Sequence, residues 1–390
     1  MRLKQVLERT VPISRYADPS IPSGDLDTSL VAVVTDRVVE GRPVVGYGFA
    51  SIGRFGQGGL IRDRFAPRLL AAPDCLIDPD RGAPDPFRAW HAMMQGEKPG
   101  GHGERSVAVG ALDMAIWDAC AKTAELPLYR YIQRHLDCEA EIEPVPVYAG
   151  GGYYFPENDR ERLRDEMQMF VADGFTHAKI KIGGEPIDDD ARRIETALEV
   201  LGDGARLAVD AIYAYTRDDA LAAAREIERF GLWWFEDICD PLDFETVAAV
   251  AGRYRGAIAA GEAQFSMADA RNLIRYAGLR PDRDILLFDI AHCYGLPEYL
   301  GILRMAESLG WARKSFFPHG GHLFTLHAVA ALGLGGAEIN PHNFQPFGGL
   351  TDEARVVAGH TSPPEMPGIG FEGRQALADM CHDLRKQAGL

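Results

Sequence analysis

The sequence predicts a (β/α)8 barrel of the TIM type, preceded by an α+β capping domain that a C-terminal tail completes. From Val145 onward, short apolar runs alternate with amphipathic helical stretches, as in repeated strand–helix units. Eight such runs with seven helical stretches between them match the number of strands in a closed barrel. The runs are continuously apolar, as parallel strands covered on both faces require.

The first part of the chain predicts the α+β capping domain, over residues 1–140. TSLVAVVTD and RPVVGYGFA, within residues 28–49, have the composition of two strands, and a polar stretch containing Gly41 joins them. Helical character follows over residues 60–72, over 83–97 and, from Ser106, up to the break at Leu126-Pro127.

The barrel is expected over residues 141–354, and the tail over 355–390 ends in a helix that packs back on the capping domain. An open doubly wound sheet is the alternative, but no GxGxxG follows a first strand. The expected barrel strands are 145–151, 177–183, 206–211, 232–237, 257–262, 285–290, 314–319 and 336–341.

Composition excludes several classes of partner. The formal net charge of the 390 residues is −16 and no basic patch stands out, which argues against nucleic acid. No apolar run approaches transmembrane length, so a membrane partner is not expected. The six cysteines show no CxxC and no regular spacing. We therefore expect buried reduced thiols and a cytoplasmic protein.

Three carboxylates end successive barrel strands. Asp210, Glu236 and Glu262 follow apolar runs, and 26 residues separate each acid from the next. Neighbouring strands lie about 4.8 Å apart, so side chains from three successive strand ends can meet at one cation. Oxygen ligands alone favour Mg²⁺ or Mn²⁺. An acid of this kind can also be a simple helix N-cap, but three in even succession favour a metal site.

Two lysines end the strand before these acids. Lys179 and Lys181 are two residues apart, so they share a face of the strand. Buried lysines are costly unless they are paired or functional. Burial and a neighbouring ammonium both lower a lysine pKa. We therefore expect Lys181 to act as a general base, with Lys179 as its electrostatic partner and as a group that polarises a substrate carboxylate.

His319 ends the seventh run, across the predicted barrel from Lys181. Asp289 ends the sixth run and can orient this imidazole. His322 competes for the same role, and we rank it second because it falls at the start of the following helix.

This set of residues predicts proton abstraction next to a substrate carboxylate that the metal and a lysine bind. The cation stabilises the negative charge that develops. An acid on the opposite face then expels a hydroxyl, which is a dehydration, or reprotonates carbon, which is a racemisation or epimerisation. A non-catalytic binder that keeps the fold is a third reading.

The chain resembles the enolase superfamily, in particular its mandelate racemase-like branch. The phrases that carry the resemblance are ALDMAIWDACAKTAELPLY, AKIKIG, AVDA, FED, AAGE, EKPGGHGERSVAVG, PHGGH, FQPFGG and PGIGFEG. Its general scheme of a lysine or histidine base with Mg²⁺ is an established case.

The resemblance implies roles for individual residues. Asp210, Glu236 and Glu262 would bind Mg²⁺, Lys181 would be the base and His319 the acid, with Asp289 beside it. Lys98 would bind the far carboxylate of a hydroxy diacid, and His322 would also contact substrate. The implied activity is that of a dehydratase that makes a 2-keto acid, in a homo-oligomer.

Some positions depart from the family pattern near the predicted pocket. Ile212 stands where a polar residue is usual, and Asp237 stands where Glu is common. His292 adds a histidine to the loop after the sixth strand, and segment 15–27 is unlike the loop that closes over substrate. These changes leave the base, the acid and the metal ligands in place, so the chemistry is better defined than the substrate.

Overall fold

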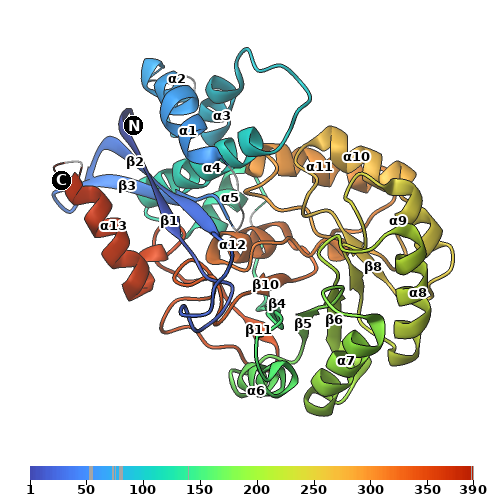
Figure 1. The fold of residues 1–390 in the computed structure, drawn as a ribbon. Helices are drawn as coiled ribbons and strands as arrows, with labels where there is room; N and C mark the ends of the chain where they lie inside the picture. Colours follow the sequence, from blue (N-terminus) through green and yellow to red (C-terminus); the bar gives the residue numbers. More distant parts are fainter. Residues whose placement is uncertain are drawn as a thin grey trace.

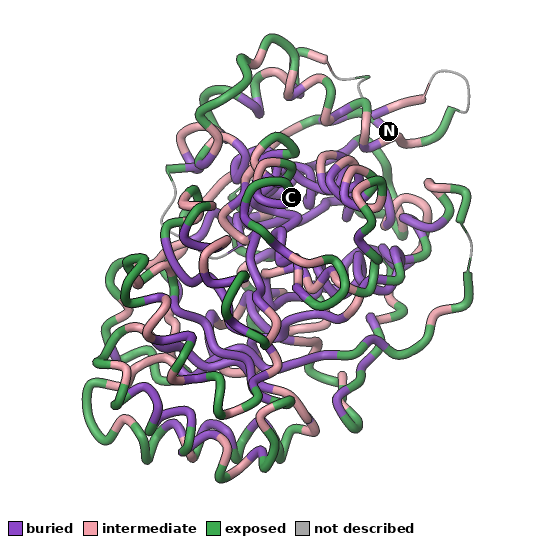
Figure 2. The backbone as a smooth tube through the Cα atoms, turned by 90° about the vertical axis from the view of Figure 1, so that its right-hand side faces the viewer, coloured by how far each residue is buried: buried purple, intermediate pink, exposed green. Residues whose placement is uncertain are grey.

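The computed structural model describes residues 1–51, 56–72, 74, 76–78, 82–138, 140–387 and 389. Two β-sheets organise these residues: a three-stranded antiparallel sheet near the N-terminus and a larger parallel sheet (Figure 1). Buried backbone gathers in the middle of the molecule and exposed backbone runs around it (Figure 2). Within the described part of the chain, no helix has the length and apolar character needed to cross a membrane.

The N-terminal sheet has the order β1-β2-β3. Its strands are β1 (Leu3–Pro12), β2 (Asp27–Val39) and β3 (Arg42–Phe49). The two strands expected within 28–49 are confirmed, and Gly41 takes the positive φ of 77° that the turn between them needs. Strand β1 was not predicted, because its half-buried residues do not alternate cleanly between apolar and polar types.

Helix α4 (Glu104–Thr123) covers this sheet and is almost wholly buried. Its backbone approaches β3 so closely that a Cβ on Gly46 would lie 2.0 Å from the carbonyl oxygen of Ala115, so glycine is required there. The other helices of this part are α1 (Gln57–Leu60), the π-helix η1 (Ile61–Phe65), α2 (Ala66–Ala71), α3 (Pro86–Met94) and α5 (Leu128–His135).

The parallel sheet has the order β10-β4-β5-β6-β7-β8-β9. Its strands are β4 (Val145–Gly150), β5 (Ala178–Lys181), β6 (Leu207–Asp210), β7 (Phe235–Glu236), β8 (Ile258–Ala260), β9 (Ile285–Leu286) and β10 (Ala337–Ile339). Between them lie α6 (Asp159–Ala172), α7 (Ile187–Leu201), α8 (Arg217–Ile227), α9 (Phe244–Ala251), α10 (Met267–Tyr276), α11 (Leu296–Ser308) and α12 (Leu323–Leu332). Short 3-10 turns are η2 (Gly204–Arg206), η3 (Glu228–Phe230) and η4 (Arg313–Ser315).

The seventh expected strand, 314–319, is reduced to a single parallel bridge between Leu286 and Phe316. Pro318 has no N–H to donate, so a regular ladder cannot form across it. Backbone hydrogen bonds nevertheless continue the ring: Phe317 N donates to Leu286 O at 3.0 Å, and Gly335 N, beside β10, donates to Phe316 O at 2.9 Å. The predicted α/β barrel with an N-terminal cap is therefore confirmed, with the strand at 314–319 corrected to a bridge.

The tail returns to both parts of the molecule. Strand β11 (His360–Thr361) pairs antiparallel with β4. After η5 (Phe371–Gly373), helix α13 (Gln375–Gln387) lies beside the N-terminal sheet and contacts β2 (Figure 1). The division of the chain at residues 140 and 354 stays a prediction.

The cysteines follow the expectation of buried thiols with one exception. Cys120, Cys239, Cys293 and Cys381 are free and buried, but Cys138 is exposed. The prediction is wrong for Cys138, which follows the end of α5 at the surface. Cys75 lies outside the described residues.

Helix α4 also holds the loop that follows β9. A Cβ on Gly110 would lie 1.8 Å from the carbonyl oxygen of Ala291, so the helix and the loop touch backbone to backbone. The buried carboxylate of Asp113 accepts a hydrogen bond from Leu296 N at 2.8 Å. The N-terminal part of the chain thus fixes the start of α11 and the loop before it.

Candidate active site

The parallel register brings the predicted charges to one edge of the barrel. Lys181 pairs with Asp210 across β5 and β6, and Asp210 pairs with Glu236 across β6 and β7. These residues end their strands, so their side chains meet at the carboxyl ends of neighbouring strands. Glu262 lies two residues beyond the last residue of β8.

Three buried acids form a cluster suited to a divalent cation. One carboxylate oxygen from each of Asp210, Glu236 and Asp237 lies within 4.8 Å of the others. Burial raises the pKa of Glu236 to about 8, although the nearby Lys179 acts in the opposite direction. A donor set made only of carboxylate oxygens fits Mg²⁺.

Glu262 lies beside this cluster and faces two other groups. Its Oε1 accepts a hydrogen bond from the Tyr213 hydroxyl at 3.1 Å, and its Oε2 lies 3.4 Å from His319 Nε2. Among the described residues Asp237, rather than Glu262, completes the tightest acidic group. Asp237 was noted in the sequence only as a departure from the family pattern.

Lys179 is buried among three carboxylates of the site. Its Nζ donates to Glu236 Oε1 at 2.5 Å and lies 3.2 Å from Glu338 Oε1 and 3.7 Å from Asp210 Oδ2. Burial lowers the pKa of Lys179, but Glu236 and then Glu338 outweigh it and hold the pKa well above its usual value. The geometry agrees with an electrostatic role.

Lys181 donates to Asp210 Oδ2, and its Nζ lies 5.0 Å from the centroid of the Tyr153 ring. The expectation of a lowered pKa is wrong for this arrangement. Burial does lower the pKa of Lys181, but the carboxylate of Asp210 outweighs it and the net shift is upward. Asp210 is itself a predicted metal ligand, so a bound cation would compete with Lys181 for this carboxylate and weaken the effect.

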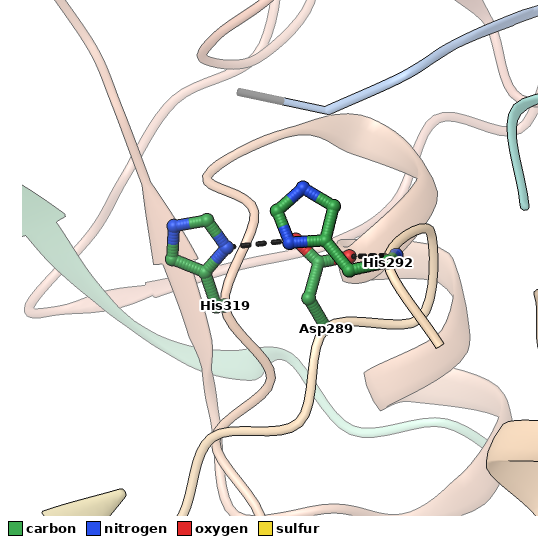
Figure 3. A group of neighbouring side chains, drawn as sticks. All are labelled: Asp289, His292 and His319. Carbon is green, nitrogen blue, oxygen red and sulfur yellow. Dashed lines mark hydrogen bonds and ion pairs between the residues drawn. The ribbon is translucent and has the colours of Figure 1, made fainter. Parts of the chain in front are cut away.

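His319 and Asp289 form the predicted pair (Figure 3). His319 Nδ1 lies 2.7 Å from Asp289 Oδ2, and Ser51 Oγ donates to the same oxygen at 3.0 Å. Burial lowers the pKa of His319, but Glu262 and Asp289 outweigh it and raise the pKa to about 10. The imidazole therefore holds its proton at neutral pH, as a general acid must.

Both proposed proton-transfer groups line the same cavity. It has a volume of about 230 Å³, and Lys181, Asp210, Glu262 and His319 are among its lining residues. The lining also includes Ile212 and His292, the two departures that we expected to shape the pocket. Ile212 has a positive φ of 45°, although it is β-branched, which marks a strained turn at a functional position.

Three residues that line the cavity or lie beside it, Arg15, Leu26 and Glu338, were not assigned to the site from the sequence. Arg15 lines the cavity, and its guanidinium lies 5.4 Å from the centroid of the Tyr153 ring. Leu26 lines the same cavity, so segment 15–27, which departs from the family pattern, does reach the site. Glu338, in β10, could have been found in the sequence, because it is an acid inside an apolar run. No residue pattern around Arg15 indicates that its loop reaches the cavity.

The structure brings none of the three predicted substrate-binding residues, Lys98, Lys179 and His322, to the cavity lining. Lys98 is exposed, and its carbonyl oxygen accepts a hydrogen bond from Arg105 Nη1 at 2.8 Å. His322 is the N-cap of α12, and its ring packs 4.8 Å from that of Phe49. Burial lowers the pKa of His322 to about 4, which favours a neutral imidazole.

Comparison with known proteins agrees with this geometry. The profile of a family described as enolase C-terminal domain-like matches residues 162–377. The chain belongs to the enolase superfamily. Its fold is thus that of a superfamily member, as the resemblance implied.

Two similar proteins are named as enzymes of sugar-derived acids. The chain is 28% identical to arabinonate dehydratase of Saccharolobus solfataricus over 281 residues, which cover 70% of this chain and 73% of the relative. It is 29% identical over 299 residues to 3,6-anhydro-alpha-L-galactonate cycloisomerase of Streptomyces coelicolor, covering 76% and 77%.

One solved structure of a similar protein contains magnesium and a bound sugar acid. L-talarate dehydratase from Polaromonas sp. JS666, complexed with Mg and L-glucarate, is 25% identical with a TM-score of 0.73, over 95% of this chain and 94% of that one. Magnesium in this superfamily member agrees with the oxygen-only acidic cluster of the present chain.

Proposed function

We propose that the chain is a Mg²⁺-dependent hydro-lyase that removes water from a hydroxy diacid and yields a 2-keto acid. The observation that carries this proposal is the single cavity that Lys181 and His319 share with Asp210 and Glu262. A base and an acid on one cavity, with a cation site between them, are the groups that a dehydration next to a carboxylate requires. The dehydratases among the similar proteins support it.

The acids, through the cation that they would hold, and Lys179 would stabilise the negative charge that develops in the reaction. Asp210, Glu236 and Glu262 would hold Mg²⁺, with Asp237 as a neighbour that shapes their charge. When bound, Mg²⁺ supplies stabilisation of negative charge on carboxylate oxygens. Lys179 adds a fixed positive charge beside Glu236 and Glu338.

Two proton transfers complete the reaction. Lys181 Nζ would take the proton from the carbon next to the substrate carboxylate. His319 Nε2, on the far side, would give its proton to the β-hydroxyl, which leaves as water. Asp289 holds His319 through Nδ1 at 2.7 Å. The resulting enol then rearranges to the 2-keto acid, so protons and oxygen balance.

The volume and the lining of the cavity favour a small dicarboxylic substrate. Its volume of about 230 Å³ is below the range of about 300–1,000 Å³ usual for drug-sized ligands. Arg15 lines it and offers a planar cation for a second carboxylate. We propose D-tartrate or a related 2,3-dihydroxy diacid, in line with a resemblance to D-tartrate dehydratase, and oxaloacetate is then the tartrate product.

The test is a substrate panel. Purified protein with Mg²⁺ is incubated with tartrates, aldaric acids and aldonic acids, and 2-keto acids are detected as semicarbazones. Lys181→Ala is expected to abolish the activity, while Lys98→Met, in the exposed loop, should retain it. Absence of keto acid from every diacid would refute the proposal. If deuterium from D2O enters next to the carboxylate without loss of hydroxyl, the chain is a racemase or epimerase.

We also propose that the enzyme is cytoplasmic and forms a homo-oligomer. The free buried cysteines favour a reducing compartment. Light scattering on purified protein decides the oligomeric state.

A further inference from the structure

Two imidazoles converge on one carboxylate oxygen at the edge of the cavity (Figure 3). His319 Nδ1 lies 2.7 Å from Asp289 Oδ2, and His292 Nδ1 lies 3.5 Å from the same atom. One ligand atom from each of the three residues lies within 4.8 Å of the others. This group, which we name the His–Asp–His cluster, is chemically different from the acidic cluster.

The donor set of the His–Asp–His cluster selects another kind of metal. Two imidazole nitrogens and one carboxylate oxygen suit Zn²⁺, Ni²⁺ or Cu²⁺, whereas Mg²⁺ prefers an octahedron of oxygens. In tetrahedral Zn²⁺ sites with bonds of about 2.1 Å, donor atoms lie about 3.4 Å apart. The observed separations of 2.7 and 3.5 Å from Asp289 Oδ2 bracket that value.

The surroundings hold these ligands in place. Asp289 Oδ1 accepts hydrogen bonds from Ala291 N at 2.7 Å and His292 N at 3.1 Å, which turns Oδ2 toward the imidazoles. The two rings lie 5.6 Å apart between centroids, at 32° to one another. Because His292 and His319 line the cavity, water can reach a fourth, open position, as in zinc sites with three protein ligands.

We propose that Asp289, His292 and His319 form a second metal site, which binds Zn²⁺ or a similar borderline-soft divalent cation and thereby inhibits the enzyme. A metal bound through His319 Nδ1 takes the place of the proton there. The ring then keeps one proton, on Nε2, and is no longer an imidazolium that can protonate a leaving hydroxyl. The metal site stands on geometry alone, and the inhibition rests on the acid role proposed for His319.

The visible absorption of Co²⁺ tests for the His–Asp–His cluster as a metal site. The protein is saturated with Mg²⁺ and titrated with Co²⁺, whose visible absorption is strong in tetrahedral sites and weak in octahedral ones. The expected result is a strong band that saturates at one equivalent and that Zn²⁺ removes. His292→Leu, similar in size to the imidazole, should lose the band. His342→Leu is the matched control, because this histidine pairs with Asp173 at 2.8 Å on the surface, and it should keep the band.

Two results would overturn the metal site: no strong band in the Mg²⁺-loaded protein, or the same band in His292→Leu. If that variant does not fold, anomalous diffraction at the zinc edge from wild-type crystals decides instead. A peak among the three residues supports the site, and a peak only at the acidic cluster refutes it.

A separate measurement addresses the inhibition. The activity of each protein after addition of Zn²⁺ is compared with its activity before the addition, at saturating Mg²⁺. Loss of activity in parallel with filling of the site is expected. Full activity with the site filled would refute the inhibition and the acid role of His319, while the metal site itself would remain. The binding measurements need no substrate, so failure of the proposed function leaves them decisive.

Discussion

Replacement of Asp289 by Asn tests how the proposed acid is held. Asp289 Oδ1 accepts from Ala291 N and His292 N, while Oδ2 faces His319 Nδ1 and Ser51 Oγ. In Asp289→Asn the amide oxygen must stay with the backbone donors, because the amide nitrogen cannot accept. The NH2 group then points at His319 Nδ1 and donates where the carboxylate accepted.

The expected loss follows from this reversal. A hydrogen bond to a charged group is worth about 1.5–3 kcal/mol, which corresponds to about 1–2 pKa units. The pKa of His319, raised to about 10 in the wild type, should fall by that amount. The lost hydrogen bond should lower the rate by about 10- to 10²-fold, and the wrong tautomer adds to this, since the same exchange in Ser–His–Asp triads costs about 10⁴-fold.

Two assays and one control separate the causes. Steady-state kinetics at saturating Mg²⁺ gives kcat, and ¹⁵N NMR of the imidazole gives the pKa of His319. Ser51→Ala removes the hydrogen bond from a neutral hydroxyl to the same oxygen at 3.0 Å and keeps both the charge of Asp289 and its contact with His319, so a smaller loss of rate than in Asp289→Asn is expected. A folded Asp289→Asn protein with kcat within tenfold of wild type would contradict the assignment.

Three further predictions concern residues around the site and in the core. Tyr213→Phe removes the 3.1 Å hydrogen bond to Glu262. Mg²⁺ binding, measured by calorimetry, should weaken about tenfold or more. An unchanged affinity would show that this hydrogen bond does not position Glu262 as a metal ligand. Arg15→Met should lower kcat/KM for diacids about 30-fold, with little change for monoacids, because a charge-assisted carboxylate contact is lost; equal loss for both classes would refute the role. His327 lies between Tyr129 N at 3.1 Å and Ile369 O at 2.9 Å, and burial lowers its pKa to about 4. Because this folded-state pKa lies below the unfolded value of about 6.5, the unfolded chain binds more protons as pH falls. Unfolding free energy should therefore drop by about 2 kcal/mol between pH 7 and pH 5 from this group. In urea unfolding, the free energy of unfolding of His327→Gln should fall by about 2 kcal/mol less than that of the wild type over this pH range. The same fall in both proteins would refute the assignment to His327.

The parts of the site that the sequence predicted are those set by local strand geometry. Parallel strands of similar length bring their ends to one edge, so Lys181, Asp210 and Glu236 were placed together from spacing alone. His319 and Asp289 followed from the same rule, although Pro318 prevents a regular seventh strand.

What the sequence did not predict depends on distances through space. The pKa of Lys181 is raised because Asp210 outweighs burial, and no spacing rule gives the balance of two opposing effects. Arg15 reaches the cavity through the path of a loop rather than through a periodic element. Lys98 follows a family phrase, but its loop is exposed in this structure.

The contact between α4 and the loop after β9 limits how this enzyme can change during evolution. Gly110 has no room for a side chain against Ala291, and Ser51, at the end of the N-terminal sheet, donates to Asp289. Exchange of the N-terminal part for that of a relative would thus disturb the residue that holds the proposed acid. New substrate preferences are more easily reached through the loop between β1 and β2, where Arg15 lines the cavity, than by recombination of whole domains.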